Sequence, residues 1–411
     1  MELLKHISGY TLISVITGAI SFLLLPILTK HLSPEDYGIL SIFNASTRFL
    51  AALIPLGMSN LLLVYLIEKK KEYPLYLKSF VKTTFIICVF CTTVISIILF
   101  FINDLFGLPP LLAISLPLIA LMIVYLETIS SYFIYLKQFK NYAKYTLVKF
   151  FIEIALVIVL VILYPFNWKG RIAALAISLL LICIYATFYF VKNKILHLRI
   201  KTTYHNKDLI KKGSPLVFMG ISIMVMNLSD RFFIEYFVGL KETGIYGIAS
   251  TLAGVLSMII GVLLKVLRPI IYEKLKLGDN LKELNKLTFK FTTGLLTASV
   301  LLYFSTPIIF KHMINERFHN ALELTSPLIF SLFFWGIYSY FSSFLMYLKQ
   351  TKIIGFISIL STIFNLFLNY FFVLHYGSIG AAYSTLITYF VISIMIYIFY
   401  LHLLKKHLNI V

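Results

Sequence analysis

The stretch ALVIVLVIL, Ala155–Leu163, decides the fold class of this chain because it is apolar on every side. The stretch LIALMIVYL, Leu118–Leu126, has the same character. A strand of a membrane barrel alternates polar with apolar residues over about ten positions, and neither stretch does so. In lipid the backbone must satisfy its own hydrogen bonds, so such runs are helices, and about 20 residues cross the hydrocarbon core. The sequence therefore predicts an all-α integral membrane protein.

The composition of the whole chain agrees with a membrane environment. Of its 411 residues, 60% are apolar and 13% are charged, whereas a soluble domain is about half apolar and about a quarter charged. The net charge of +19 does not indicate nucleic acid, because the basic residues are spread among short loops. The cysteines Cys88, Cys91 and Cys183 fall inside apolar runs, so we expect them to pack within the bundle.

About twelve runs are long enough to span the membrane. They lie near 9–30, 38–66, 80–102, 111–134, 145–165, 171–191, 214–238, 244–270, 289–310, 325–346, 353–374 and 379–403. The first run has no small-residue cleavage site after it, so we expect it to remain as a span. Pro55 and Gly57 interrupt the second span, where we expect a kink.

Basic residues are unequally divided between the two sets of loops. One set, with the chain ends, holds Lys5, Lys69–Lys71, Lys78, Lys137, Lys140, Lys144, the lysines of 192–212 and 274–290, Lys349, Lys352, Lys405 and Lys406. The other set holds Lys30, Lys169, Arg171, Lys241, Lys311 and Arg317. Because loops rich in Lys and Arg stay inside, both termini are expected on the cytoplasmic side.

Three short motifs occur twice in the same order. The pairs are YLKQFK at 135–140 and YLKQTK at 347–352, GRIAA at 170–174 and GSIGAA at 377–382, and YGI at 37–39 and 246–248. They indicate a duplicated six-helix unit, and an even number of helices gives parallel repeats. We expect an N-terminal six-helix bundle at 1–191, a basic cytoplasmic linker at 192–213 and a C-terminal six-helix bundle at 214–411. Transporters with such repeats bind substrate at the repeat interface.

Two arginines are expected inside the membrane, where a charge costs about 2.5–3.5 kcal/mol. Arg48 and Arg231 each follow an asparagine, Asn44 and Asn227, by four residues. A guanidinium group presents five donors in a planar fork that suits phosphate. Either the arginines bind a phosphorylated substrate in one polar cavity, or they form structural ion pairs, as Arg231 would with Glu235 one turn along the helix.

Four acidic residues, Asp230, Glu127, Glu153 and Glu235, are candidates for ion coupling or ion pairing. Asp230 either titrates and couples transport to H+ or Na+, or neutralises an arginine. Glu153 is expected to pair with Lys149, four residues earlier. Glu127 is expected to be buried as a neutral or paired acid.

Other polar residues have simpler expected roles. Lys265 and Arg268 are placed at the inner mouth, where they face lipid head groups or receive a phosphate. The amides of Asn60, Asn365 and Asn369 are expected to bridge helices. The chain contains no Walker loop, HExxH or GxSxG motif, and its nine histidines show no ligand spacing. No catalytic residue, metal site or cofactor is therefore predicted.

Two stretches carry a resemblance to a known family. The opening from Gly9 through LPILTKHLSPEDYG at 25–38 resembles that of Wzx-type polysaccharide repeat-unit flippases, members of the multidrug/oligosaccharidyl-lipid/polysaccharide (MOP) exporter superfamily. The stretch from NLSDRFFI at 227–234 through GIYG at 244–247 resembles the start of that family's second half. The resemblance extends over the whole chain.

The resemblance implies two six-helix bundles arranged as a V around a central cavity. It implies alternating-access transfer of an undecaprenyl-diphosphate-linked oligosaccharide across a bacterial cytoplasmic (inner) membrane, for a surface polysaccharide such as O-antigen, lipopolysaccharide or capsule. Arg48 and Arg231 are by position the candidates to meet the diphosphate. The implied partners are the lipid-linked substrate, membrane lipids, and the polymerase and chain-length proteins of the pathway.

Two other functions stay open. A cation-coupled multidrug or toxin exporter of the same superfamily would need an acidic cavity that binds cations. A membrane polymerase or ligase of the same pathway would usually need a large outer loop, which the sequence lacks.

Overall fold

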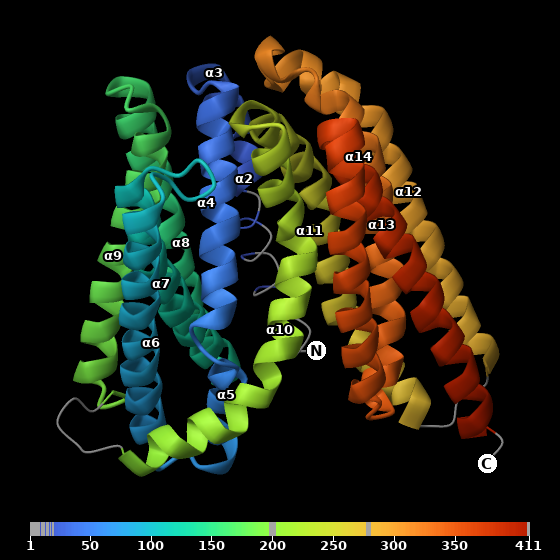
Figure 1. Ribbon diagram of the computed structural model, residues 1–411. Helices are drawn as coiled ribbons and strands as arrows, with labels where there is room; N and C mark the ends of the chain where they lie inside the picture. The colour runs from blue at the N-terminus through green and yellow to red at the C-terminus, as the bar shows by residue number, and fades with distance from the viewer. Residues whose placement is uncertain are drawn as a thin grey trace. The chain divides into compact units, whose positions relative to one another are not determined.

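The computed structural model describes residues 9, 13, 16, 18, 20–196, 203–276 and 281–408 (Figure 1). The elements in these ranges are α2 Ile20–Leu23, α3 Leu25–His31, α4 Pro34–Leu53, α5 Met58–Glu68, α6 Tyr73–Phe101, α7 Pro110–Tyr135, α8 Phe139–Val157, the π-helix η1 Ile158–Leu163, α9 Asn167–Lys192, α10 Thr203–Phe237, α11 Leu240–Lys276, α12 Leu281–Met313, the short 3₁₀ helix η2 Glu316–Phe318, α13 Ala321–Tyr347 and α14 Thr351–Leu408. Every regular element is thus a helix, and the predicted all-α fold is confirmed.

Most of these helices are long enough to cross a membrane. Within the described ranges eight are also sufficiently apolar, and α4 with α5 forms a ninth span that bends by 47° at the predicted kink. Helix α14 has 58 residues and is divided by Gly377, whose φ of 63° and ψ of −145° are not helical, so it supplies two spans. Of the first expected span, 9–30, the structure describes residues 9, 13, 16, 18 and 20–30, and its second half forms α2 and α3.

The chain divides into two compact units. In the described ranges, unit 1 contains 39–228 with the residues up to Ile20, and unit 2 contains 21–38 and 229–408. The division predicted at 1–191, 192–213 and 214–411 stays a prediction, and residues 197–202 of the expected linker lie outside the described part.

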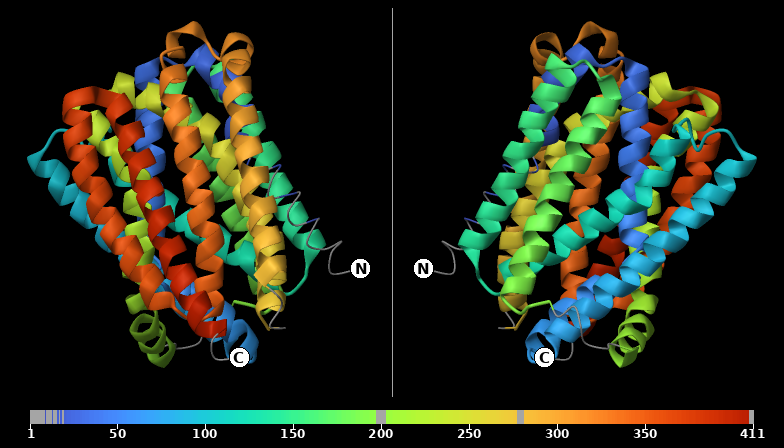
Figure 2. Two further views of the ribbon diagram at one scale, coloured as in Figure 1. Left: turned by 90° about the vertical axis from the view of Figure 1, so that its right-hand side faces the viewer. Right: turned by 90° about the vertical axis from the view of Figure 1, so that its left-hand side faces the viewer.

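Each unit is built around one central helix (Figure 2). In unit 1, α7 contacts α5, α6, α8 and α9, and in unit 2, α13 contacts α11, α12 and α14. These two helices are also the most buried of the spans. They are the fourth and tenth of the predicted spans, so they hold equivalent places in the predicted repeat.

The helix ends that carry the YLKQ motif form the same turn in both units. Lys137 after α7 and Lys349 after α13 have left-handed backbones, with φ of 56° and 58°. The N–H groups of Gln138 and Gln350 each donate to the carbonyl oxygen five residues earlier, at 2.9 Å in both cases. This is the hydrogen bond that closes a helix end over a left-handed residue. The common geometry supports the duplication inferred from the sequence.

Two glycines hold the segment 21–38 against α11 within unit 2. A Cβ atom at Gly38 would overlap the carbonyl oxygen of Leu240, and one at Gly244 would overlap that of Pro34. Only glycine permits the two backbones to approach this closely. The first copy of the YGI motif therefore serves backbone packing.

The start of α10 is fastened to α5 and α6 by the carboxylate of Asp208. It accepts hydrogen bonds from the hydroxyls of Tyr65 at 2.6 Å and Tyr76 at 3.3 Å, and it pairs with Lys212 at 2.8 Å. Burial acts to raise the pKa of Asp208, but hydrogen bonds from Lys212 and Tyr65 outweigh it and hold this pKa below its ordinary value.

Replacing Asp208 with Asn removes the charge that these donors share. We expect D208N to lower the free energy of unfolding by about 2 kcal/mol at neutral pH. Because folding lowers the pKa of Asp208, the carboxylate stabilises the fold fully above its unfolded pKa of about 4 and loses this effect as the pH falls through the folded value. Thermal unfolding in detergent at neutral and acidic pH measures the difference, which should shrink in acid.

Glu68→Gln is the matched control, because Glu68 is exposed on α5 and makes no hydrogen bond or ion pair with the described residues. It should unfold like the wild type at every pH. Equal stability of D208N and wild type at neutral pH would contradict a fastening role.

Candidate functional site

The exposed face of α4 inside its span is polar. Exposed side chains on other spans are mostly large and apolar, as Phe85 and Phe90 are on α6. On α4, between 37 and 53, the exposed side chains are Asn44 and Arg48, whereas Thr47 is buried. Because hydrocarbon cannot solvate a guanidinium group, this face must meet water or a polar ligand. The expectation that Asn44 and Arg48 share a face is confirmed.

Arg48 makes no hydrogen bond or ion pair with any residue that the structure describes. It lies near enough to Glu127 of α7 for electrostatic attraction. Glu127 is itself exposed, so its expected burial is wrong. The packed face of α7 is formed by its neighbours Leu126, Thr128 and Ile129, which turns position 127 outward.

Glu153 is the centre of a buried ionic cluster in unit 1. Its carboxylate lies 3.5 Å from Nζ of Lys149 and 3.0 Å from Nη2 of Arg171, and only 5% of its side chain is exposed. The predicted pair with Lys149 is confirmed. The second cation was missed, because Arg171 was assigned to an outer loop.

The position of Arg171 follows from a close approach of two backbone segments. A Cβ atom at Gly170 would meet the carbonyl group of Leu160 in η1. The π-helix thus lies directly against the beginning of α9, which brings Arg171 to Glu153. Nη1 of Arg171 is buried with no partner among the described residues. The residues Arg48, Glu127, Lys149, Glu153 and Arg171 comprise three cations and two carboxylates, a formal charge of +1.

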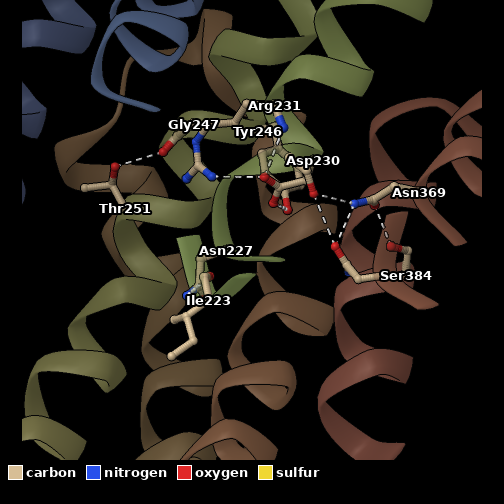
Figure 3. Close-up of polar contacts among 11 residues, drawn as sticks. Ile223, Asn227, Asp230, Arg231, Tyr246, Gly247, Thr251, Asn369 and Ser384 are labelled. Atoms are coloured by element: carbon tan, nitrogen blue, oxygen red, sulfur yellow. Dashed lines mark hydrogen bonds and ion pairs between the residues drawn. The ribbon is translucent and has the colours of Figure 1, made fainter. Parts of the chain in front are cut away.

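In unit 2, Asp230 and Arg231 of α10 form a compact cluster with Tyr246 of α11 (Figure 3). Asp230 pairs with Nη1 of Arg231 at 3.1 Å and accepts a hydrogen bond from the hydroxyl of Tyr246. The guanidinium carbon of Arg231 lies 5.7 Å from the centre of the Tyr246 ring, a distance typical of a cation–π contact. Tyr246 is fully buried, and 17% of the Arg231 side chain is exposed.

Tyr246 belongs to the second copy of the YGI motif, but sequence reasoning assigned it no role. Tyr246 lies on α11 and Asp230 on α10. The two residues are too far apart in the sequence for helical spacing to predict their contact. Pairing of Arg231 with Glu235 stays a prediction.

A network of amides and hydroxyls joins α10 to both halves of α14. Nδ2 of Asn369 donates to Oδ1 of Asn365 at 3.1 Å and to Oγ of Ser229 at 3.3 Å. Nδ2 of Asn365 donates to Thr388, and Ser384 donates to Oδ1 of Asn369. The expectation that these two amides bridge helices is confirmed.

The remaining predicted site residues lie on α10 and α11. Asn227 donates to the carbonyl oxygen of Ile223 at 2.8 Å within α10. Lys265 is exposed on α11, and Nε of Arg268 donates to Ser343 at 3.2 Å. Arg48 belongs to unit 1 and Arg231 to unit 2, so the single cavity expected for both stays a prediction. No metal-binding group of His, Cys, Asp or Glu occurs in the described ranges.

Comparison with solved structures shows which known fold the chain adopts. The fold matches an inward-facing multidrug resistance MATE family transporter of the MOP superfamily, with a TM-score of 0.74, 14% identity and 95% of each chain covered. It also matches the lipid II flippase MurJ in an inward closed conformation, with a TM-score of 0.70 and 17% identity over 100% of this chain and 89% of that one. The chain is thus a multi-pass membrane protein with the MOP transporter fold.

The sequence defines the family. The profile of the polysaccharide biosynthesis protein family matches residues 3–275, so the chain belongs to that family. It is also 26% identical over 391 residues to an uncharacterized membrane protein of Haemophilus influenzae, with 89% of each chain covered. The resemblance to the polysaccharide branch of the MOP superfamily is confirmed at the level of family and fold.

Replacing Glu153 with Gln leaves the largely buried Arg171 and the partly exposed Lys149 without their carboxylate. We expect E153Q to lower the free energy of unfolding by about 3 kcal/mol, because breaking a buried ion pair leaves an uncompensated charge. The thermal unfolding midpoint in detergent measures the effect. The double variant E153Q/R171Q should recover part of the loss, since it removes one of those cations. An unchanged midpoint for E153Q would show that the cluster contributes nothing to stability.

Proposed function

We propose that this protein is a flippase that moves an undecaprenyl-diphosphate-linked oligosaccharide repeat unit across the bacterial inner membrane for surface polysaccharide biosynthesis. Its membership of the polysaccharide biosynthesis protein family supports a role in that process. The observation that carries the proposal is the exposed guanidinium group of Arg48 within a membrane span, which has no ion-pair or hydrogen-bond partner among the described residues. It acts as a transporter rather than an enzyme.

The charged diphosphate is the part of such a substrate whose transfer through hydrocarbon costs the most free energy. Arg48 offers planar donors to a phosphate without first breaking an ion pair, because no described residue occupies them. Asn44, one turn away on the same face, adds an amide that donates to phosphate or sugar oxygens. The formal charge of +1 in the unit 1 cluster also favours an anionic cargo over a cationic one.

Arg231 is placed differently, because Asp230 already neutralises it. The Asp230–Arg231–Tyr246 cluster suits coupling to an ion gradient. Protonation of Asp230, or Na+ in place of the guanidinium group, would release Arg231 to meet a phosphate. H+ or Na+ is thus the proposed coupling ion.

A cation-coupled exporter of small molecules is the second candidate. The fold match to a multidrug resistance MATE family transporter favours it, as does the exposed carboxylate of Glu127. A single carboxylate beside an arginine is a weaker cation site than an acidic cavity, so the flippase is preferred. The orientation with cytoplasmic termini, and cooperation with a polymerase and chain-length proteins, belong to the same proposal.

The flippase proposal is tested by complementation of a strain that lacks this gene. Loss of the protein should cause lipid-linked repeat units to accumulate on the cytoplasmic face, and the wild type should clear them. We expect R48A to reduce clearance at least tenfold, because a charge-assisted bond to phosphate contributes about 1.5–3 kcal/mol. R48K should retain more activity than R48A, since it keeps the charge.

Lys30→Ala is the control for loss of one positive charge, because Lys30 is exposed near the end of α3, outside the polar face of α4. Its expected activity is that of the wild type. Full clearance by R48A at normal membrane levels would remove Arg48 from the mechanism. Absence of accumulation in the deletion strain would reject the flippase itself.

The coupling proposal has a separate measurement. We expect D230N to abolish the dependence of transport on the H+ or Na+ gradient in proteoliposomes while the protein still binds its lipid-linked substrate. Transport by D230N that still responds to either gradient as the wild type does would exclude Asp230 as the coupling site.

A further inference from the structure

Helix α7 is the central helix of unit 1, yet it exposes one carboxylate in the interior of its span. Of its described residues from 119 to 133, Glu127 alone is exposed, and its neighbours Leu126 and Thr128 are buried. Glu127 lies eight residues before the end of α7 at Tyr135, a rise of about 12 Å that places it within the membrane. Because hydrocarbon cannot solvate a carboxylate, this point of α7 must meet water or a polar ligand, as the exposed face of α4 does.

The charges that act on Glu127 come from α4 and α8. Arg48 of α4 and Lys149 of α8 are both close enough to attract its carboxylate. Lys149 is held 3.5 Å from Glu153, and 31% of its side chain is exposed. Glu127 makes no hydrogen bond or ion pair with the residues that the structure describes. Its carboxylate therefore acts on Arg48 through space and leaves the donors of the guanidinium group open.

Glu127 reduces the positive charge that an anion meets at this part of unit 1. Without it, the three cations Arg48, Lys149 and Arg171 and the one carboxylate of Glu153 would give a formal charge of +2, and Glu127 lowers this to +1. An anion that approaches Arg48 is thus attracted less strongly. The Coulomb energy is proportional to each charge, so a diphosphate with two negative charges is affected twice as strongly as a phosphodiester with one.

Weaker attraction is an advantage where a ligand must leave again. Conduction through a channel requires binding that is strong enough for entry and weak enough for exit, and the same physical requirement applies to a site that carries a ligand across a membrane. Among variants of one site, differences in affinity lie mostly in the dissociation rate. A fixed carboxylate near the binding guanidinium group therefore shortens the time for which an anionic ligand stays bound.

We propose that Glu127 is the residue that promotes release of the cargo, because its carboxylate repels the phosphates that Arg48 binds. Arg48 and Glu127 form an opposed pair, in which Arg48 captures the anionic head group and Glu127 limits how tightly it is held. This inference rests on the proposed function, since its ligand is the anionic lipid-linked cargo at Arg48. It gives the exposed carboxylate of α7 a role in moving an anion rather than in binding a cation.

Native mass spectrometry of the purified full chain tests the proposal with two lipid probes that differ by one phosphate. The probes are undecaprenyl-diphosphate glucose and undecaprenyl-phosphate glucose, which carry two negative charges and one. Glu127→Gln should bind the first about fivefold more tightly than the wild type and the second about twofold, because the repulsion that is removed doubles with the charge. Glu127→Asp keeps the carboxylate and should bind both probes like the wild type.

Two controls assign the gain in affinity to the charge at position 127. Glu127→Ala removes the carboxylate without offering an amide that can donate to a phosphate, so it should show the same gain as E127Q. A gain confined to E127Q would overturn the proposal. Glu68→Gln removes a carboxylate that is exposed at the end of α5 and has no hydrogen bond or ion pair with the described residues, and it should bind like the wild type. An equal gain in E68Q would mean a general effect of net charge and would also overturn the proposal.

Transport in the deletion strain separates release from binding. At normal membrane levels, E127Q should clear lipid-linked repeat units about threefold more slowly than the wild type, because the cargo that it binds more tightly dissociates more slowly. A residue that only supports the packing of α7 would lower binding and clearance together when replaced. Unchanged or weaker binding of the diphosphate probe by E127Q, or clearance equal to that of the wild type, would overturn the proposal.

The variant R48A distinguishes failure of this inference from failure of the proposed function. Loss of probe binding in R48A without any gain in E127Q would leave the flippase standing and would reject the release role of Glu127. A wild type that does not bind the diphosphate probe would reject both. The thermal unfolding midpoint in detergent identifies any misfolded variant, and E127Q, which is nearly the same size and shape as the wild type at this position, is the variant that disturbs packing least.

Discussion

Hydrocarbon cannot solvate a charge, and this constraint explains where the ionic side chains of the spans lie. Glu153 satisfies it in a buried cluster with Lys149 and Arg171. Asp230 satisfies it through Arg231 and Tyr246. Arg48 is exposed and has no ion-pair or hydrogen-bond partner among the described residues. Its face of α4 must therefore be wet or occupied, which makes it the functional candidate of unit 1.

The two units share a scaffold but differ in charge. The central helices α7 and α13 end in the same YLKQ turn, with the same backbone hydrogen bond. The chemistry placed on these scaffolds is different. In unit 1, Arg48 presents an exposed guanidinium group, and together with Glu127, Lys149, Glu153 and Arg171 it gives a formal charge of +1. In unit 2, an arginine paired with Asp230 lies beside a network of buried amides. Duplication thus preserved the packing, while the polar residues diverged toward different tasks.

Contacts within one helix could be predicted from spacing, and contacts between helices could not. The Lys149–Glu153 pair and the common face of Asn44 and Arg48 follow from the four-residue period of a helix. The partnership of Arg171 with Glu153 depends on the close approach of η1 and α9 at Gly170, which has no signature in the local sequence. The exposure of Glu127 was missed for a related reason, because the packed face of a wholly apolar helix cannot be read from its hydrophobic pattern.

The sequence by itself determined that the chain lies in a membrane and is helical, because long apolar runs have few alternatives in lipid. It also indicated the repeat and the family resemblance, because short motifs survive duplication. The tertiary structure decided which charges are neutralised and which are left exposed. It also decided that Arg171 of α9 meets Glu153 of α8. Those outcomes depend on how the helices rotate and approach one another, and packing between distant segments sets both.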